Sequence, residues 1–138
     1  MRKQLTILAL LAAASLPAKD IFVNTPRTTL LLKAEDNKPL HISYYGDKVT
    51  DAEEVYRAFS LWQEAYPAFG LGNDFIPALS VRHADGNMST ELVYQSDKET
   101  KEANATVYTI TMKDKAYDFY VDMCYRAYDN CDVIEAWS

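Results

Sequence analysis

Residues 105–128 read ATVYTITMKDKAYDFYVDMCYRAY, and this stretch decides the fold. It contains two runs of alternating side chains on either side of a polar break at Lys113-Asp114-Lys115. A period of two is the period of a strand that buries one face. The stretch therefore predicts two antiparallel strands, over residues 105–112 and 117–128. The apolar positions that define the period are Tyr108, Ile110, Met112, Phe119, Val121, Met123 and Tyr125.

Shorter runs with strand composition lie on both sides of this stretch. Polar segments rich in turn-forming residues separate them, at residues 35–38, 85–87 and 96–102. Short strands with regular turns are typical of an antiparallel β-sandwich, and 138 residues are the length of one domain. We therefore predict a mainly β fold class. The additional strands are expected at residues 20–24, 27–34, 39–45, 78–83 and 90–95, with a last one from Val133.

The pattern changes period once, after residue 49. Thr50 and Glu53 have the spacing of a capping box, which satisfies orphan amides at the start of a helix. Apolar residues then recur every three or four positions, the period of one helix face. Pro67 disfavours helical backbone at the residue before it, so one short helix is predicted to end there. The face consists of Val55, Phe59, Trp62 and Tyr66.

The first 18 residues have the layout of a secretory signal peptide. Arg2 and Lys3 precede an apolar run, and Ala18 precedes polar residues. The run is too short to cross a bilayer, so no membrane span is predicted. We place cleavage after Ala18, with Ala14 and Ser15 as alternatives, and expect an exported protein, periplasmic or secreted.

The charge of the remaining 120 residues disfavours one class of partner. Removal of two basic residues leaves 12 against 20 acidic ones, a net charge of about −8. An acidic surface repels phosphate backbones, so no nucleic-acid partner is expected.

Catalytic and metal-binding patterns are scarce in this sequence. His41, His83 and two cysteines match no zinc spacing, so we predict no metal site and no cofactor. Cys124 and Cys131 flank a turn that does not place them opposite each other, so free thiols are favoured over a disulfide. Carboxylate pairs of the kind used in glycoside hydrolysis occur on surfaces that we expect to be solvated, and no catalytic residue is assigned. These pairs are Glu53-Glu54 and Asp118 with Asp122.

Residues 66–86 read YPAFGLGNDFIPALSVRHADG and form the least regular segment. They contain three of the four glycines and two of the five prolines, which predicts a long loop and then a tight turn. Asp85 can accept a bond from a nearby amide and Gly86 can adopt positive φ, so His83 is interpreted as part of that turn. Two alternatives, packing and ligand contact, stay open for the rings Tyr66, Phe69 and Phe75.

Several short motifs occur in one order along the chain. They are Asn24-Thr25-Pro26-Arg27-Thr28-Thr29-Leu30, Tyr44-Tyr45-Gly46, Tyr66-Pro67-Ala68-Phe69-Gly70, Asp74-Phe75, Pro77-Ala78-Leu79, His83-Ala84-Asp85-Gly86, Phe119-Tyr120-Val121, Tyr125-Arg126-Ala127-Tyr128 and Asp132-Val133-Ile134-Glu135-Ala136-Trp137. This ordered set resembles the amino-terminal domain of family-36 glycoside hydrolases, the alpha-galactosidases. The resemblance covers nearly all of residues 19–138.

The resemblance implies an accessory role. In that family the domain is a large, supersandwich-like β-sandwich placed before a (β/α)₈ barrel, and the barrel carries two catalytic aspartates. A barrel needs about 250 residues, so its catalytic residues are not expected in this chain. We therefore expect residues 19–138 to be a truncated amino-terminal domain of an exported alpha-galactosidase, inactive alone. The last strand runs directly to Ser138, which favours an incomplete sandwich. A free-standing, non-catalytic glycan-binding sandwich is the alternative.

The resemblance also implies partners and contact residues. The expected ligand is a galactose-containing oligosaccharide, bound through the family's catalytic domain. Family members form homo-oligomers in which a loop of the sandwich reaches a neighbouring sugar pocket. The matching loop makes Asp74 a candidate for hydrogen bonds to galactose hydroxyls, with Asn73 and Phe75 beside it. The alternative is that Asp74 caps a turn next to Asn73.

Overall fold

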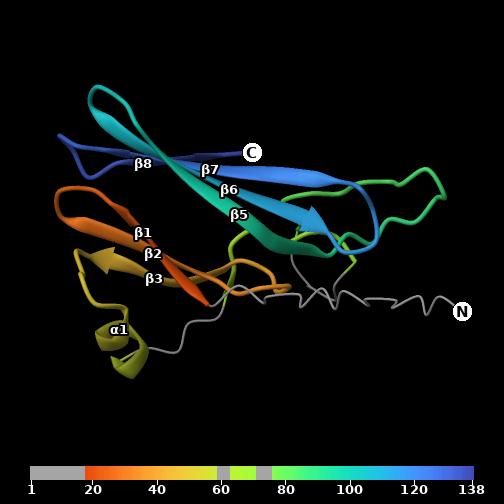
Figure 1. Ribbon diagram of the computed structural model, residues 1–138, viewed down its shortest axis with the longest axis horizontal. Helices are drawn as coiled ribbons and strands as arrows, with labels where there is room; N and C mark the ends of the chain where they lie inside the picture. The colour runs from red at the N-terminus through yellow and green to blue at the C-terminus, as the bar shows by residue number, and fades with distance from the viewer. Residues whose placement is uncertain (1–17, 59–62, 71–75) are drawn as a thin grey trace, which may run out of the picture.

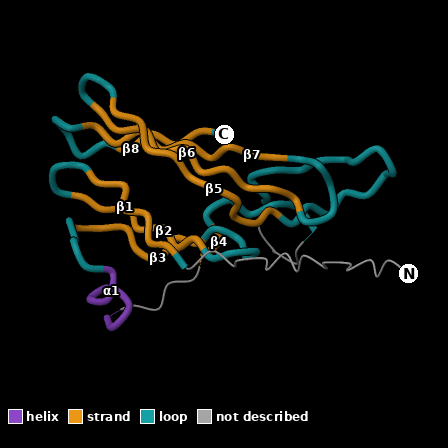
Figure 2. The backbone as a smooth tube through the Cα atoms, in the orientation of Figure 1, coloured by secondary structure: helices purple, strands orange, loops and turns teal. Residues whose placement is uncertain are grey.

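The computed structural model of the protein describes residues 18–58, 63–70 and 76–138. These residues form two four-stranded antiparallel sheets and one short helix, which confirms the predicted mainly β sandwich (Figures 1 and 2). The strand orders are β1-β2-β3-β4 and β5-β6-β7-β8. The elements are β1 (Lys19–Asn24), β2 (Thr28–Ala34), β3 (His41–Asp47), α1 (Ala52–Ala58), β4 (Gln63–Glu64), β5 (Leu92–Lys101), β6 (Ala105–Asp114), β7 (Tyr120–Tyr128) and β8 (Ile134–Trp137).

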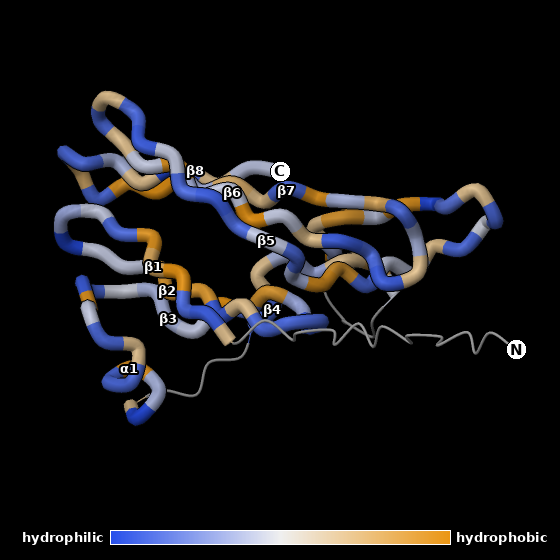
Figure 3. The backbone as a smooth tube through the Cα atoms, viewed as in Figure 1, coloured by the Kyte–Doolittle hydropathy of each residue, from blue (hydrophilic) through white to orange (hydrophobic). Residues whose placement is uncertain are grey.

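The main core lies between the two sheets, where each contributes one apolar face. Figure 3 shows apolar backbone segments where the sheets face each other. In the second sheet the register pairs Ile110 with Met123 and Met112 with Val121, as the alternation in the sequence predicts. The buried members of this core include Ile21, Val23, Leu30, Leu32, Leu40, Leu92, Tyr94, Ile110, Met112, Val121, Met123 and Tyr125.

Strand β2 is buried on both faces, which explains its run of three leucines. Leu30 and Leu32 point into the main core, whereas Leu31 points to the opposite face. There Leu31 is fully buried with Ala52 and Val55 of α1, so the helix covers the outer face of the first sheet (Figure 1). Burying a leucine side chain contributes about 1.5–3 kcal/mol, so Leu31 anchors the helix to the sheet.

The helix is shorter than predicted and begins one residue later. Asp51 caps it, because the amide of Glu53 donates to Asp51 Oδ1 at 2.9 Å, and the predicted cap at Thr50 is wrong. The chain is already in strand β4 at Gln63, so the helix does not reach Tyr66. Pairing with β3 takes precedence over the helical period there. Phe59 and Trp62 lie outside the described residues.

Strand β5 extends through the segment that the sequence predicted to be a turn. Its pairing with β6 continues from Leu92 to Lys101, with a register shift between Tyr94 and Ser96. The second half is polar because β5 is an edge strand whose side chains face solvent. Charged side chains on an edge strand oppose pairing with the strands of other molecules. Composition alone therefore identified the wrong residues as the turn.

Residues 78–83 do not form the predicted strand. Within the described residues, the segment makes one isolated bridge, between Ala68 and Leu79. The His83 amide bonds to the carbonyl of Asn87, within the same loop. Alternating side chains can therefore occur in a loop whose backbone partners are local.

The structure agrees with the predicted free thiols and with the predicted last strand. Cys124 and Cys131 are free, and Cys124 lies opposite Trp137 in the β7–β8 pairing. Strand β8 begins at Ile134, one residue after the predicted start.

Candidate functional site

The predicted sugar-contact residues Asn73, Asp74 and Phe75 lie outside the described residues. The structure does describe the chain on both sides of them. That surrounding chain, residues 65–70 and 76–91, is called here the connecting loop. It lies at the end of the sandwich where β6 turns into β7 (Figure 1).

The two sides of the connecting loop are held together at its base. The amide of Phe69 donates to the carbonyl of Leu79 at 3.0 Å, and the amide of Ala78 donates to Pro67 at 2.8 Å. Ala68 is buried in the main core, and Leu79 packs against the same core. The base is therefore fixed to the sandwich.

Gly70 allows a third segment to approach this base. It has φ of 104°, a conformation that L side chains rarely adopt, and an added Cβ would lie 2.6 Å from the Cα of Ser89. Beside it, the amide of Thr90 donates to the carbonyl of Phe69 at 3.0 Å. Residues 89–90 can pass this closely because residue 70 has no side chain.

His83 belongs to a tight turn, as the sequence predicted. The amide of Gly86 donates to the carbonyl of His83 at 2.9 Å, and the amide of Asn87 donates to Asp85 Oδ1 at 3.0 Å. Gly86 has φ of 89°, which completes the turn. His83 Nε2 lies 3.3 Å from the hydroxyl of Thr90, which is fully buried. The imidazole and the carboxylate therefore shape the loop.

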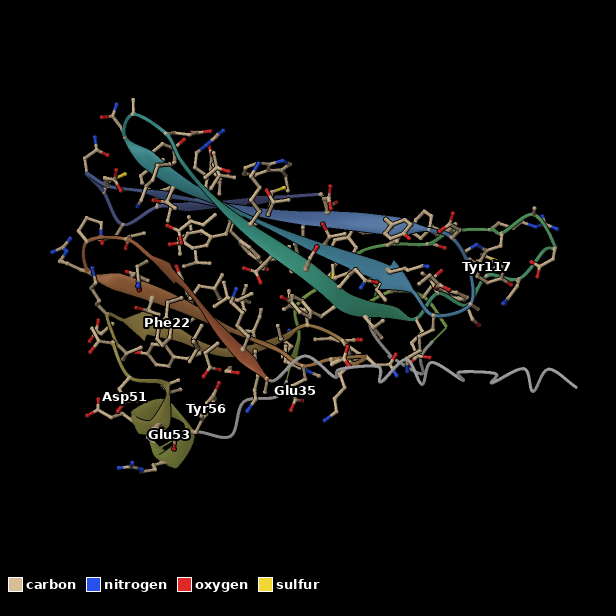
Figure 4. The ribbon with its side chains drawn as sticks, in the orientation of Figure 1. Phe22, Glu35, Asp51, Glu53, Tyr56 and Tyr117 are labelled. Carbon is tan, nitrogen blue, oxygen red and sulfur yellow. The ribbon has the colours of Figure 1, made fainter. Side chains whose placement is uncertain are left out.

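Tyr117 ties this turn to the β6–β7 hairpin (Figure 4). Its ring stacks on His83 with centroids 3.6 Å apart and planes 7° apart. Its hydroxyl donates to Asp85 Oδ2 at 2.7 Å and accepts from Asn87 Nδ2 at 2.9 Å. The Asn87 amide and the Tyr117 hydroxyl hold the pKa of Asp85 below its usual value. Tyr117 thus joins segments about 30 residues apart in the chain.

Asp114 is the residue of this end that sequence reasoning missed. It is 2% exposed, and its Oδ1 accepts from the amides of Ala116 at 2.7 Å and Tyr117 at 2.9 Å. Its Oδ2 accepts from the amide of Glu91 at 2.8 Å. One buried carboxylate therefore fixes both the β6–β7 turn and the start of β5. We call Gly70, Asp114, Tyr117 and the connecting loop the loop end.

Asp132 has a similar role at the opposite end of the sandwich, which we call the corner end. It lies in the β7–β8 turn and accepts from the Thr25 hydroxyl at 2.9 Å and the Arg27 amide at 2.7 Å. The Arg27 side chain adds a bond at 2.8 Å, and the bonds from Arg27 hold the pKa of Asp132 below its usual value. Asp132 therefore links the hairpins of the two sheets.

The chemistry available to these groups is binding and positioning. Within the described residues, no three histidine, cysteine, aspartate or glutamate side chains are grouped so that they could hold a metal ion. The carboxylates Asp118 and Asp122 are exposed on the surface, beside Lys113 and Thr111 respectively. None of the described helices has the length and apolar character needed to traverse a bilayer.

Comparisons with known proteins give one family. Residues 37–138 match the family model described as the glycosyl hydrolase family 36 N-terminal domain. No curated protein sequence matches the chain.

Solved structures with a similar fold are alpha-galactosidases. AgaA from Geobacillus stearothermophilus has a TM-score of 0.72 and 21% identity, over 86% of this chain and 21% of that enzyme. AgaB from the same organism has a TM-score of 0.70 and 21% identity, over 91% of this chain and 22% of that enzyme. The Lactobacillus brevis enzyme has a TM-score of 0.66 and 18% identity, over 83% of this chain and 20% of that enzyme. AgaA variants were solved with stachyose and with raffinose. The chain thus has their fold and spans about a fifth of their length.

Proposed function

The chain belongs to the glycosyl hydrolase family 36 N-terminal domain family, and from this premise we propose that it serves an alpha-galactosidase as an accessory sandwich. The observation that carries the proposal is the family match over residues 37–138. The catalytic aspartates then belong to a barrel that these 138 residues do not encode. The chain alone does not hydrolyse galactosides.

The substrate of the complete enzyme is a galactose-containing oligosaccharide in this proposal. The support is that AgaA, which has the same fold over this region, was solved with stachyose and raffinose. The reaction is removal of terminal alpha-linked galactose. The complete enzyme is a homo-oligomer.

Asp74, with Asn73 and Phe75, is the proposed contribution of this domain to a sugar pocket. Support comes from the frame around these residues, because Phe69 bonds to Leu79 and Ala78 bonds to Pro67 at the base of the connecting loop. A loop with a fixed base can present a side chain at a repeatable position. A carboxylate can accept hydrogen bonds from galactose hydroxyls.

Residues 1–18 are proposed to be a signal peptide, and the protein is exported to the periplasm or secreted. The support is the basic start followed by a short apolar run. Amino-terminal sequencing of protein from a fractionated culture tests this directly. A mature chain that begins at Lys19 outside the cytoplasm is expected, and a cytoplasmic chain beginning at Met1 would contradict it.

The genomic sequence downstream of Ser138 tests the accessory role. We expect a reading frame that encodes a (β/α)₈ barrel with two aspartates at the ends of strands, as continuation of this chain or as its partner. A downstream region that encodes no such barrel would contradict the proposal.

A further inference from the structure

The outer face of the second sheet carries a pattern that neither the core nor the proposed function uses. The register places directly paired residues on the same face, so the residues opposite the core follow from it. Tyr120 and Trp137 are 50% and 42% exposed on this face, although they are large rings. We call the surface the outer face. It comprises Val93, Ser96, Lys98, Thr100, Ala105, Val107, Thr109, Thr111, Lys113, Tyr120, Asp122, Cys124, Arg126, Tyr128, Glu135 and Trp137. Val93, Ala105 and Val107 are buried.

Each exposed ring is supported from one side by a cation. Lys113 Nζ lies 5.3 Å from the centre of the Tyr120 ring, and the Arg126 guanidinium lies 5.2 Å from that of Trp137. A cation over a ring is attractive and limits its reorientation. Tyr120 and Trp137 nevertheless remain exposed to solvent as residues. The two rings are therefore held in place with surface left for a ligand.

The spacing of the rings suits an extended ligand. Trp137 is paired with Cys124, which is four residues along β7 from Tyr120. Four residues of strand span about 13 Å. The two rings thus lie at separate positions along the sheet, within reach of one short oligosaccharide.

A row of polar groups crosses the sheet between the rings. Ser96, Thr111 and Asp122 occupy neighbouring positions on β5, β6 and β7. The Thr111 hydroxyl donates to Asp122 Oδ1 at 2.6 Å, which orients the carboxylate. A carboxylate has two oxygens and can accept further hydrogen bonds from hydroxyl groups.

The charges of the outer face indicate a neutral ligand. Arg126 pairs with Glu135 at 2.8 Å and with Glu102 at 3.1 Å, and Lys113 lies 3.8 Å from Asp118. The cations beside the rings therefore already have carboxylate partners. A phosphate-bearing ligand would also meet a chain of net charge −6. An apolar protein partner is disfavoured because the rings are separated by polar groups.

We propose that the outer face binds a neutral oligosaccharide, with Tyr120 and Trp137 stacking on sugar rings and Asp122 and Thr111 bonding to hydroxyls between them. The assignment to galactose-bearing oligosaccharides rests on the proposed function. One face of galactose presents a continuous set of C–H groups, which packs against an aromatic ring, while its hydroxyls need polar partners. None of the residues that carry this proposal is among Asn73, Asp74 and Phe75.

Titration of the full, isotope-labelled chain with stachyose tests this proposal by NMR. We expect shifts of the Tyr120 and Asp122 amides and of the Trp137 indole. Tyr120→Ala and Trp137→Ala should each weaken binding by about two- to tenfold. Tyr45→Ala is the matched control, because Tyr45 is 65% exposed on the other sheet, and it should bind as wild type. Asp122→Asn, which keeps the shape of the side chain, should also weaken binding.

The result that overturns the proposal is equally specific. Absence of stachyose binding would overturn it, as would binding that survives both ring substitutions in variants with wild-type thermal midpoints. Binding lost in Asp74→Ala but retained in Tyr120→Ala would show that the sugar is bound through Asp74 instead. The accessory role is judged separately by the downstream reading frame, so the two ideas can fail independently.

Discussion

The loop end and the corner end of the sandwich both depend on an aspartate, but on different physical grounds. At the loop end, Asp114 is buried and accepts three backbone amides. At the corner end, Asp132 accepts from Arg27, whose side chain is 86% exposed. Water and salt reach the Arg27–Asp132 pair and weaken it, whereas the bonds to the buried carboxylate of Asp114 are shielded. The comparison teaches that the loop end resists changes in solvent, while the corner end responds to them.

The largest expected effect comes from Asp114→Ala. It leaves three backbone amides without their acceptor at a buried site, so the free energy of unfolding should fall by at least about 3 kcal/mol. Urea denaturation measures the loss. Asp114→Asn keeps one carbonyl oxygen and should lose less. Equal stability of the wild type and Asp114→Ala would contradict the buried-carboxylate account of the loop end.

Gly70→Ala should be the next most damaging change. Positive φ and the close Cα of Ser89 both oppose a side chain, so we expect a loss of about 1–3 kcal/mol in the free energy of unfolding. Gly86→Ala is the matched control. It shares positive φ, but its nearest neighbour would be the Arg82 side chain, 3.9 Å away. A loss at Gly70 no larger than at Gly86 would show that Ser89 does not constrain the site.

The corner end should be sensitive to acid. The pKa of Asp132 is lower in the folded protein than the usual value of about 3.9, so its stabilising contribution is complete above that value. The contribution is lost as the pH falls through the lower, folded-state pKa. Asp132→Asn should therefore flatten the fall in stability between about pH 5 and pH 2.

Thermal midpoints at stepped pH and salt measure this behaviour. Added salt should reduce the difference between wild type and Asp132→Asn at neutral pH, since the Arg27 side chain is exposed. Asp85 and Asp97 also have lowered pKa values, so the slope should not vanish completely. In Asp97, burial raises the pKa, but bonds from Lys19 and Tyr94 outweigh it. Parallel pH profiles for wild type and Asp132→Asn would refute the role of Asp132.

Tyr117→Phe should have the smallest effect of the series. The stack on His83 stays, while the bonds to Asp85 and Asn87 are lost at an exposed position. Hydrogen exchange should speed up at residues 83–87, with little change in global stability. Unchanged exchange at these amides would show that the hydroxyl does not hold the turn.

Periodicity predicted those parts of the fold in which side-chain burial alone decides the structure. The alternation around Ile110 and Met123 gave β6 and β7, and the two packed sheets followed from it. It failed where backbone pairing, and not the pattern of side chains, decides the structure. The charged half of β5 looks like a turn until β6 is placed beside it, and residues 78–83 look like a strand until their local partners are known.

The loop end shows the same division. The turn at His83, Asp85 and Gly86 was predictable because its chemistry is local. Asp114 was missed because one of the amides that it binds belongs to Glu91, 23 residues away. Its bond to the amide of Ala116, two residues later, is a local signal that the sequence does offer. The outer face required the register, since only pairing shows that Tyr120 and Trp137 share a side.

An activity assay of the purified full chain tests the central claim, that this family member supports catalysis and does not perform it. An aryl alpha-galactoside is the substrate, and release of the aryl group is followed over hours at high protein concentration. The account predicts a rate equal to that of buffer. Turnover that rises in proportion to the chain concentration, and that co-purifies with it, would contradict the account.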